Sequence, residues 1–161
     1  MKGVRLGIAR GRGRDDDRAA VIIADTGFWL ALANARDRHH SAAARAFANV
    51  REPLVTTWPV LTETCHLLAT RLGHVALERF VTAGGGGAFE LFQLERAHLS
   101  RAATLMKKYR DLPMDLADAS LVILAEELGS GRILSTDVRD FRTYRLKNHK
   151  PFQNLLELET V

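Results

Sequence analysis

Four acidic residues stand where a carboxylate fits the surrounding sequence poorly. Asp25 ends the apolar run VIIAD, and Asp137 ends the run ILSTD. Asp118 interrupts the apolar side of PMDLADASLVILAEEL, and Glu63 borders the apolar stripe of PVLTETCHLLATRL. A carboxylate that faces a protein core loses hydration worth roughly several kcal/mol, unless a bound cation, backbone donors or a basic side chain compensates for it. Together, the four acids predict a pocket that holds a divalent metal.

The chemistry that needs such a pocket is phosphoryl transfer. Carboxylate oxygens are the ligands that hard divalent cations prefer, which favours Mg²⁺ or Mn²⁺. One metal would activate a water, and the same ion or a second one about 3.5–4 Å away would stabilise the leaving oxygen. Asp115 and Asp140 are candidates for auxiliary ligands beside the four acids.

Each acid taken alone also has an ordinary structural explanation. Two acids at strand ends and two on the core-side margins of helices form a more specific pattern than any one of them. The structural alternatives are a helix cap for Asp25, a turn for Asp137, a solvated surface position for Glu63, and pairing with Arg71 or Arg101 for Asp118.

Short apolar runs alternate with helical patterns along the chain. We expect strands at residues 20–24, 54–56, 89–94, 132–135 and 155–158, and helices at 28–35, 41–50, 59–72, 75–83, 99–109 and 113–128. This alternation predicts an α/β fold, in which a mostly parallel sheet of four to five strands is covered on both faces. Ligands of such sheets bind beyond the carboxyl ends of the strands, so Asp25 and Asp137 are expected to meet there.

The composition is that of an ordinary globular domain. The 161 residues are 47% hydrophobic and 26% charged, and no run approaches the ~18 apolar residues of a membrane span. A single cysteine, Cys65, suits a reducing cytoplasm and excludes a cysteine-based zinc site. The spacing of His39, His40 and His66 also lacks a zinc-ligand pattern.

Positive charge is concentrated at the N-terminus. Residues 1–18 hold six basic and three acidic residues, whereas the remaining chain holds 17 basic and 16 acidic residues. We expect a disordered Arg/Gly-rich tail over residues 1–18 and a single domain over residues 19–161. The body is not a generic basic nucleic-acid binder, so local basic groups would have to contact phosphates. The candidates for these contacts are Arg36, Arg38, His39, Arg71 and Arg139.

Four segments, in this order and spacing, resemble the PIN-domain family and, within it, the VapC-type toxins of bacterial toxin–antitoxin pairs. These are VIIADTGFWLALAN, LTETCHLLATRLG, PMDLADASLVILAEELG and ILSTDVRDF, which span nearly the whole body from residue 20 to residue 145. The resemblance implies a three-layer α/β/α sandwich with the activity of a metal-dependent ribonuclease. Its acidic quartet would be Asp25, Glu63, Asp118 and Asp137, with Asp115 and Asp140 as neighbouring acids, and with Thr26 and Thr136 as hydroxyls that orient a water or contact phosphate.

The functional hypothesis is therefore an endoribonuclease that uses one or two Mg²⁺ or Mn²⁺ ions. Its partners would be the RNA substrate, an antitoxin protein that covers the acidic cleft, and a second copy of the chain. Phe28, Trp29 and Trp58 could contact that second copy, unless they are buried in the core.

Three alternatives to this hypothesis remain. They are a PIN fold that binds RNA or protein without cutting it, a DNA-directed nuclease, and a phosphatase of the haloacid-dehalogenase type. The phosphatase would need a second aspartate where this chain has Gly27.

Overall fold

The structure, a computed structural model, describes residues 20–157, so the predicted tail at residues 1–18 lies outside it. Within this range, the strands form one sheet in the order β3-β2-β1-β4-β5, and every neighbouring pair is parallel. The strands are β1 (Ile22–Ala24), β2 (Leu54–Thr57), β3 (Glu90–Phe92), β4 (Arg132–Leu134) and β5 (Gln153–Asn154). The predicted parallel sheet is thus confirmed.

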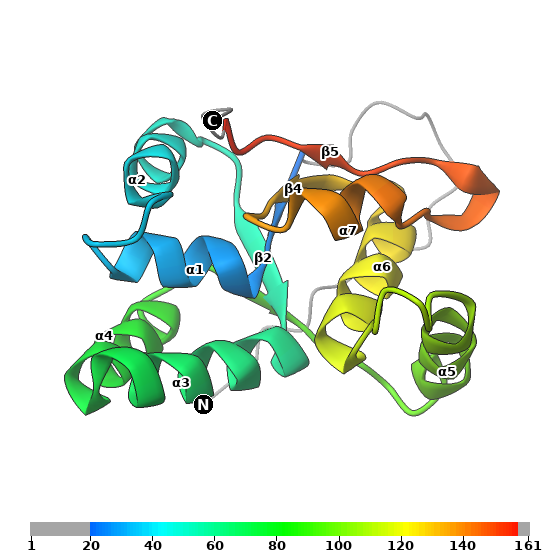
Figure 1. Cartoon of the computed structure of the whole chain (residues 1–161), viewed down its shortest axis with the longest axis horizontal. Coiled ribbons are helices and arrows are strands. Elements are labelled where there is room, and N and C mark those ends of the chain that lie inside the picture. The colour runs from blue at the N-terminus through cyan, green and yellow to red at the C-terminus, as the bar shows by residue number, and fades with distance from the viewer. Residues whose placement is uncertain (1–19, 158–161) are drawn as a thin grey trace.

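Helices cover both faces of this sheet. From β1 the chain adds β2 and β3 on one side of the sheet, and it then adds β4 and β5 on the other side. Because crossovers between parallel strands are right-handed, the helices of the first half and those of the second half lie on opposite faces. Figure 1 shows α1 to α4 on one side of β2 and α5 to α7 on the other, which confirms the three-layer α/β/α sandwich. The helices are α1 (Thr26–Ala33), α2 (His40–Asn49), α3 (Trp58–Leu72), α4 (His74–Gly85), α5 (His98–Lys108), α6 (Leu116–Leu128) and α7 (Val138–Thr143). Between residues 20 and 157, no helix combines the length and the apolar character needed to cross a membrane.

Helix α6 runs through the centre of the core. Every residue from Ala119 to Ala125 is buried, so the expected single apolar stripe is wrong for this helix. Neighbouring elements surround its middle turns, and only the two ends reach solvent. Asp118 lies in the first turn, where the chain emerges from the core, and it is half-buried.

Several element boundaries differ from those expected. Helix α6 begins at Leu116 instead of residue 113, because the Asp115 side chain caps it by accepting a hydrogen bond from the Asp118 amide at 2.9 Å. The fifth strand is Gln153–Asn154 and not 155–158, since Gln153 pairs with Arg132 at the edge of β4. The short helix α7 was not expected, because six residues are too few to show a helical period.

Two of the three aromatic residues proposed for contacts with a second copy lie in the core. Phe28 is fully buried and Trp29 is only 4% exposed, so both are excluded as surface contacts. Trp29 packs against Phe28, Phe80 and Phe89 at ring-centroid distances of 5.0–5.5 Å. Trp58, at the start of α3, remains 47% exposed.

The carboxyl edge of the sheet brings distant segments together. Strand β1 pairs with β4, and the Asp25 amide extends this ladder by donating to the Leu134 carbonyl at 3.1 Å. At the end of β2, the hydroxyls of Thr57 and Ser120 share a hydrogen bond of 2.6 Å. The first turns of α1, α6 and α7 therefore meet at this edge, as the sequence predicted for Asp25 and Asp137.

Candidate active site

Asp25 lies directly after β1 and caps α1. Its Oδ1 accepts a hydrogen bond from the Thr26 amide at 2.6 Å, and its Oδ2 accepts one from the Ser135 hydroxyl at 2.7 Å. The residue is only 8% exposed, and burial raises the pKa of its carboxyl to about 6. The two hydrogen bonds oppose this rise, whereas repulsion from Glu63 and Asp137 adds to it. Asp25 is thus a desolvated carboxylate with other acids close by.

Asp118 lies in the first turn of α6 and is held from two sides. Its amide donates to Asp115, and its Oδ2 accepts a hydrogen bond from the Tyr144 hydroxyl at 3.1 Å. Burial, followed by repulsion from Asp115 and Asp25, raises the pKa of its carboxyl to about 7. The alternative pairing with Arg101 is wrong, because Arg101 binds Glu126 at 2.6 Å.

Asp137 follows β4 and caps α7, where its Oδ1 accepts a hydrogen bond from the Asp140 amide at 3.2 Å. Its own amide donates to the Ser135 hydroxyl at 2.9 Å. Partial burial raises the pKa of the Asp137 carboxyl, although the residue as a whole is exposed to solvent. One serine hydroxyl therefore joins Asp25 to the segment that carries Asp137.

Glu63 reaches the site from α3. The Thr26 hydroxyl donates to its Oε2 at 2.5 Å, so the residue after Asp25 links the two acids. Thr136 packs against Gly27 in the first turn of α1, so closely that a Cβ on Gly27 would collide with the Thr136 Oγ1. Of the two predicted hydroxyl residues, Thr26 therefore begins α1 and Thr136 packs against its first turn.

The auxiliary acids have structural roles at helix starts. Asp115 caps α6, and Asp140 lies in the first turn of α7, where it also pairs with Arg139 at 3.1 Å. Their proximity raises the pKa of Asp118 and Asp137, respectively, by charge repulsion. Both acids thus border the site, and each fixes the backbone that carries one of the quartet.

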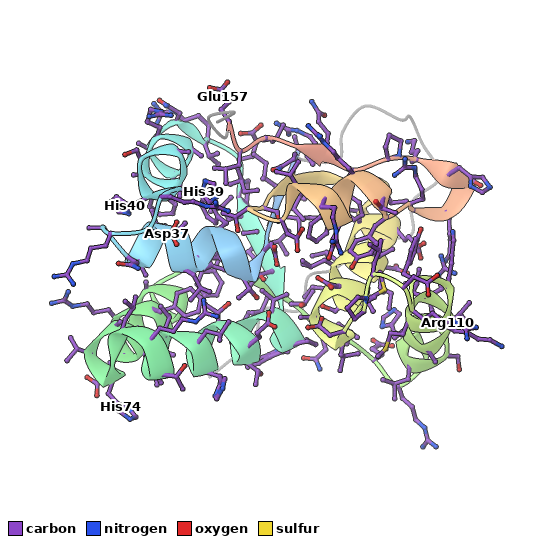
Figure 2. The ribbon with its side chains drawn as sticks, in the orientation of Figure 1. Asp37, His39, His40, His74, Arg110 and Glu157 are labelled. Atoms are coloured by element: carbon purple, nitrogen blue, oxygen red, sulfur yellow. The ribbon has the colours of Figure 1, made fainter. Side chains whose placement is uncertain are left out.

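The histidines considered as zinc ligands do not gather around a common point. Figure 2 shows His39 and His40 beside the connection between α1 and α2. The His40 Nδ1 bonds to the Ala31 carbonyl at 2.8 Å, and the His39 Nε2 accepts a hydrogen bond from Arg38 at 2.9 Å. His66 is exposed on α3.

The donor set of the acidic site fits a hard divalent cation. Among residues 20–157, none of the four acids forms an ion pair with a basic side chain, and the available ligands are all carboxylate oxygens. In the same range, no three or more acidic, histidine or cysteine side chains are grouped closely enough to hold a metal ion by themselves. Mg²⁺ is usually held by one or two carboxylates together with waters and substrate phosphates, so it does not need a complete cage of protein ligands here.

Two residues of the site were missed in the sequence. Ser135 could have been found, because it lies two positions before Asp137 in an otherwise apolar strand end. Tyr144 gave no signal, since its hydroxyl meets Asp118 only through the packing of α7 against α6. Burial and the adjacent acids hold the pKa of the Tyr144 hydroxyl far above its usual range, so it remains a donor.

Comparisons with known proteins agree with this architecture. The structure of VapC20 from Mycobacterium tuberculosis, described as a Sarcin-Ricin loop cleaving toxin, superposes with a TM-score of 0.69. The match has 23% sequence identity and covers 74% of this chain and 92% of that chain. It supports the fold alone.

Sequence similarity identifies the family. The chain is 33% identical to Ribonuclease VapC26 of Mycobacterium tuberculosis over 124 residues, which cover 77% of this chain and 92% of that protein. It is also 45% identical to the 23S rRNA-specific endonuclease VapC20 of the same species over 56 residues. This match covers 35% of this chain and 43% of that protein. Residues 22–146 match the PIN domain. The chain therefore belongs to the PIN domain family and is of the VapC type within it.

Proposed function

We propose that this protein is a divalent-metal-dependent endoribonuclease and the toxin of a toxin–antitoxin pair. The observation that carries the proposal is the pair of desolvated carboxylates, Asp25 and Asp118, which repel each other beyond the carboxyl end of a parallel sheet. Desolvated acids with shifted pKa values are characteristic of functional sites. The names of two similar proteins, a ribonuclease and a 23S rRNA-specific endonuclease, support RNA as the substrate.

The acids Asp25, Glu63, Asp118 and Asp137 would hold one or two Mg²⁺ or Mn²⁺ ions. A divalent cation, when bound, supplies the positive charge that lowers the pKa of a nucleophilic water and neutralises the developing charge on phosphate. The four acids supply only acceptor oxygens, so without a cation they would repel a phosphodiester.

The protein's own residues position the reacting groups. A carboxylate of the quartet accepts the hydrogen bond of the attacking water and orients its oxygen toward the phosphorus atom. The Thr26 hydroxyl holds Glu63, and Ser135 holds Asp25, so these acceptors do not have to reorganise during the reaction. Thr136 lies beside Asp137 and could donate its hydroxyl to a phosphate oxygen. Asp115 and Asp140 fix the helix starts that carry Asp118 and Asp137.

The proposal includes partners. An antitoxin would inhibit the enzyme by covering the acidic site, and a second copy of the chain could pack against exposed Trp58. Both partners would meet the enzyme in the cytoplasm.

Gly27 argues against the phosphatase alternative. An aspartate at this position would collide with Thr136, whose Oγ1 lies 2.0 Å from the position of a Cβ.

The decisive experiment compares cleavage of an RNA pool by the wild-type protein and by Asp118→Asn, after removal of any co-purified partner. Each protein is assayed with Mg²⁺, with Mn²⁺ and with EDTA. We expect cleavage only by the wild type, and only with metal. If folded, metal-loaded wild type leaves RNA intact but cuts DNA, the DNA-nuclease alternative is correct. If it cuts neither, the chain is a binding module.

A further inference from the structure

We propose that a patch of exposed lysine and arginine side chains beside the acidic site binds the phosphate backbone of a folded RNA substrate, outside the cleaved segment. The inference rests on the proposed ribonuclease function and adds a second contact surface to it. The patch comes from the end of α5 and from the chain between α7 and β5. Its members, here named the basic patch, are Lys108, Arg110, Arg142, Lys147 and Lys150.

The fold joins the two segments of the basic patch. The Arg145 amide donates to the Tyr109 hydroxyl at 3.0 Å, and the rings of Tyr109 and Tyr144 pack edge to face with centroids 5.0 Å apart. Lys108 holds its Nζ 4.9 Å from the centroid of the Tyr109 ring. Figure 1 shows the turn between α7 and β5 on the same side as α5, and Figure 2 shows Arg110 projecting at this edge.

A tight turn holds two of the lysines close together. The Leu146 amide donates to the Lys150 carbonyl at 2.9 Å, and Asn148 and His149 adopt φ angles of 64° and 59°. The left-handed region costs about 1–2 kcal/mol for a residue with a Cβ. Asparagine and histidine adopt this region more readily than most residues, and Lys147 and Lys150 flank the turn that they form.

The charge of the basic patch is largely available to a ligand. Lys108, Arg110, Arg142 and Lys150 form no ion pair with any described residue, and Lys147 lies 3.8 Å from Glu126. The Glu126 side chain is 2% exposed and already binds Arg101 at 2.6 Å, so it adds little negative charge to the surface. Asp111 is the acid exposed in the same stretch of chain. Positive charge therefore dominates at this edge.

A buried side chain links the acidic site to the segment that carries the basic patch. Tyr144 precedes Arg145 in the chain, and its hydroxyl contacts Asp118 at 3.1 Å, so a single side chain connects the two regions. Four acids repel a phosphodiester, and residues 19–161 carry almost no net charge. Cations beside the site can offset this repulsion by contacting phosphates on either side of the cut. The position next to the acids therefore favours an RNA ligand over an acidic protein.

The test measures RNA binding separately from cleavage. The full chain carrying Asp118→Asn binds a labelled RNA stem-loop of about 30 nucleotides while the salt concentration is varied. Arg110→Gln/Lys150→Gln is compared with Arg45→Gln/Arg79→Gln, which removes the same charge from exposed sites on α2 and α4. The slope of log affinity against log salt should decrease by about 0.7–0.9 for each lost phosphate contact. At 0.1 M salt, two lost contacts correspond to roughly 25- to 60-fold weaker binding.

We expect the patch variant to show this loss and the control variant to change affinity less than twofold. With Asp118 restored, the patch variant should cut a tetranucleotide as fast as the wild type. Equal losses in both variants would overturn the proposal, and so would unchanged RNA binding with lost binding of a co-purified acidic protein. If the wild type cuts no RNA but the stem-loop still binds through the basic patch, the inference stands and the proposed ribonuclease function fails.

Discussion

The Tyr144 hydroxyl donates a 3.1 Å hydrogen bond to Oδ2 of Asp118, which joins the residue after α7 to the first turn of α6. Tyr144 is fully buried, and the rings of Tyr109 and Phe141 pack edge-on against it at 5.0 and 5.4 Å. Within residues 20–157, no donor contacts the other oxygen of the carboxylate, Oδ1. The tyrosine thus fixes the carboxylate through Oδ2 and leaves Oδ1 available as a ligand.

Removing this hydroxyl should weaken metal binding without unfolding the protein. Groups that orient metal ligands typically contribute 10- to 100-fold to metal affinity. We expect Tyr144→Phe to lower Mn²⁺ affinity by about this factor, as measured by titration calorimetry. Excess Mn²⁺ should restore most of the cleavage rate, because the four proposed ligands remain.

Tyr109→Phe is the matched control for this prediction. The variant removes a hydroxyl in the same aromatic cluster. This hydroxyl accepts a hydrogen bond from the Arg145 amide and forms none with an acid among the described residues. Its Mn²⁺ affinity should equal that of the wild type. An equal loss of affinity in both variants would show that the cluster, and not the hydrogen bond to Asp118, determines metal binding.

Asp118→Asn should stabilise the metal-free protein while abolishing cleavage. The charged carboxylate is disfavoured by burial and by its acidic neighbours, and asparagine can still accept the Tyr144 hydrogen bond. We expect a gain of about 1–2 kcal/mol in the free energy of unfolding at pH 8, measured by urea denaturation with EDTA. Asp111→Asn, at an exposed position, should change it by less than about 0.5 kcal/mol. A destabilised Asp118→Asn protein would contradict the unfavourable burial of this charge.

The metal-free protein should lose stability as the pH rises from 4 to 8. Asp25 and Asp118 have folded-state pKa values of about 6 and 7, above the usual 3.8, so the folded state binds more protons between these values. The contribution of these two groups to the free energy of unfolding is therefore greatest below pH 4. It is lost as the pH rises through 6–7, by on the order of 1–3 kcal/mol per group. Melting temperatures at several pH values, with EDTA, measure this slope.

Metal and mutation provide the controls for the pH prediction. Saturating Mg²⁺ should flatten or reverse the slope, because the cation binds only the deprotonated acids. Asp25→Asn/Asp118→Asn should remove it with or without metal. A wild-type slope that equals that of the double variant would assign the pH dependence to other groups.

The sequence predicted the sheet and the placement of the acids because both depend on local patterns. VIIAD and ILSTD are buried strands that end in an acid, and parallel pairing of β1 with β4 brings these ends together. The position of Asp118 also came from sequence, although for a partly wrong reason. Helix α6 is buried on nearly all sides, so the acid stands out by its place in the first turn and not by interrupting a stripe.

The contacts that hold the acids could not be predicted in the same way. The hydrogen bonds of Ser135 to Asp25 and of Tyr144 to Asp118 join residues 110 and 26 positions apart. Such contacts depend on side-chain rotamers and on the packing of one helix against another, which no period of hydrophobicity encodes. The basic patch could not be predicted for the same reason, since only the fold brings Tyr109, next to Arg110, into contact with Arg145.

Ser135→Ala should destabilise the protein and reduce cleavage. The variant removes the donor to Asp25 Oδ2 and the acceptor of the Asp137 amide from a fully buried position. Leaving buried polar groups unpaired costs about 1–3 kcal/mol, which urea denaturation can measure. Thr143→Ala, which removes an exposed hydroxyl that donates to the Arg139 carbonyl, should cost less than about 0.5 kcal/mol. Equal costs would mean that Ser135 does not support the two acids.

Gly27→Ala should disturb the site through Thr136. The new Cβ would lie 2.0 Å from Thr136 Oγ1 and 3.3 Å from its Cβ, so the threonine has to rotate or the start of α1 has to move. We expect a loss of about 1–3 kcal/mol in the free energy of unfolding and a lower cleavage rate. Gly85→Ala is the control, because a Cβ there meets nothing within 4 Å and should be neutral or slightly stabilising.

A double variant separates the contact with Thr136 from a general effect on α1. Thr136→Ala removes the Oγ1 atom, so Gly27→Ala should cost much less stability in that background than in the wild type. Cleavage would not recover with stability if the Thr136 hydroxyl contacts phosphate, because both double and single Thr136→Ala variants lack it. Full recovery of cleavage in the double variant would instead limit Thr136 to packing against α1.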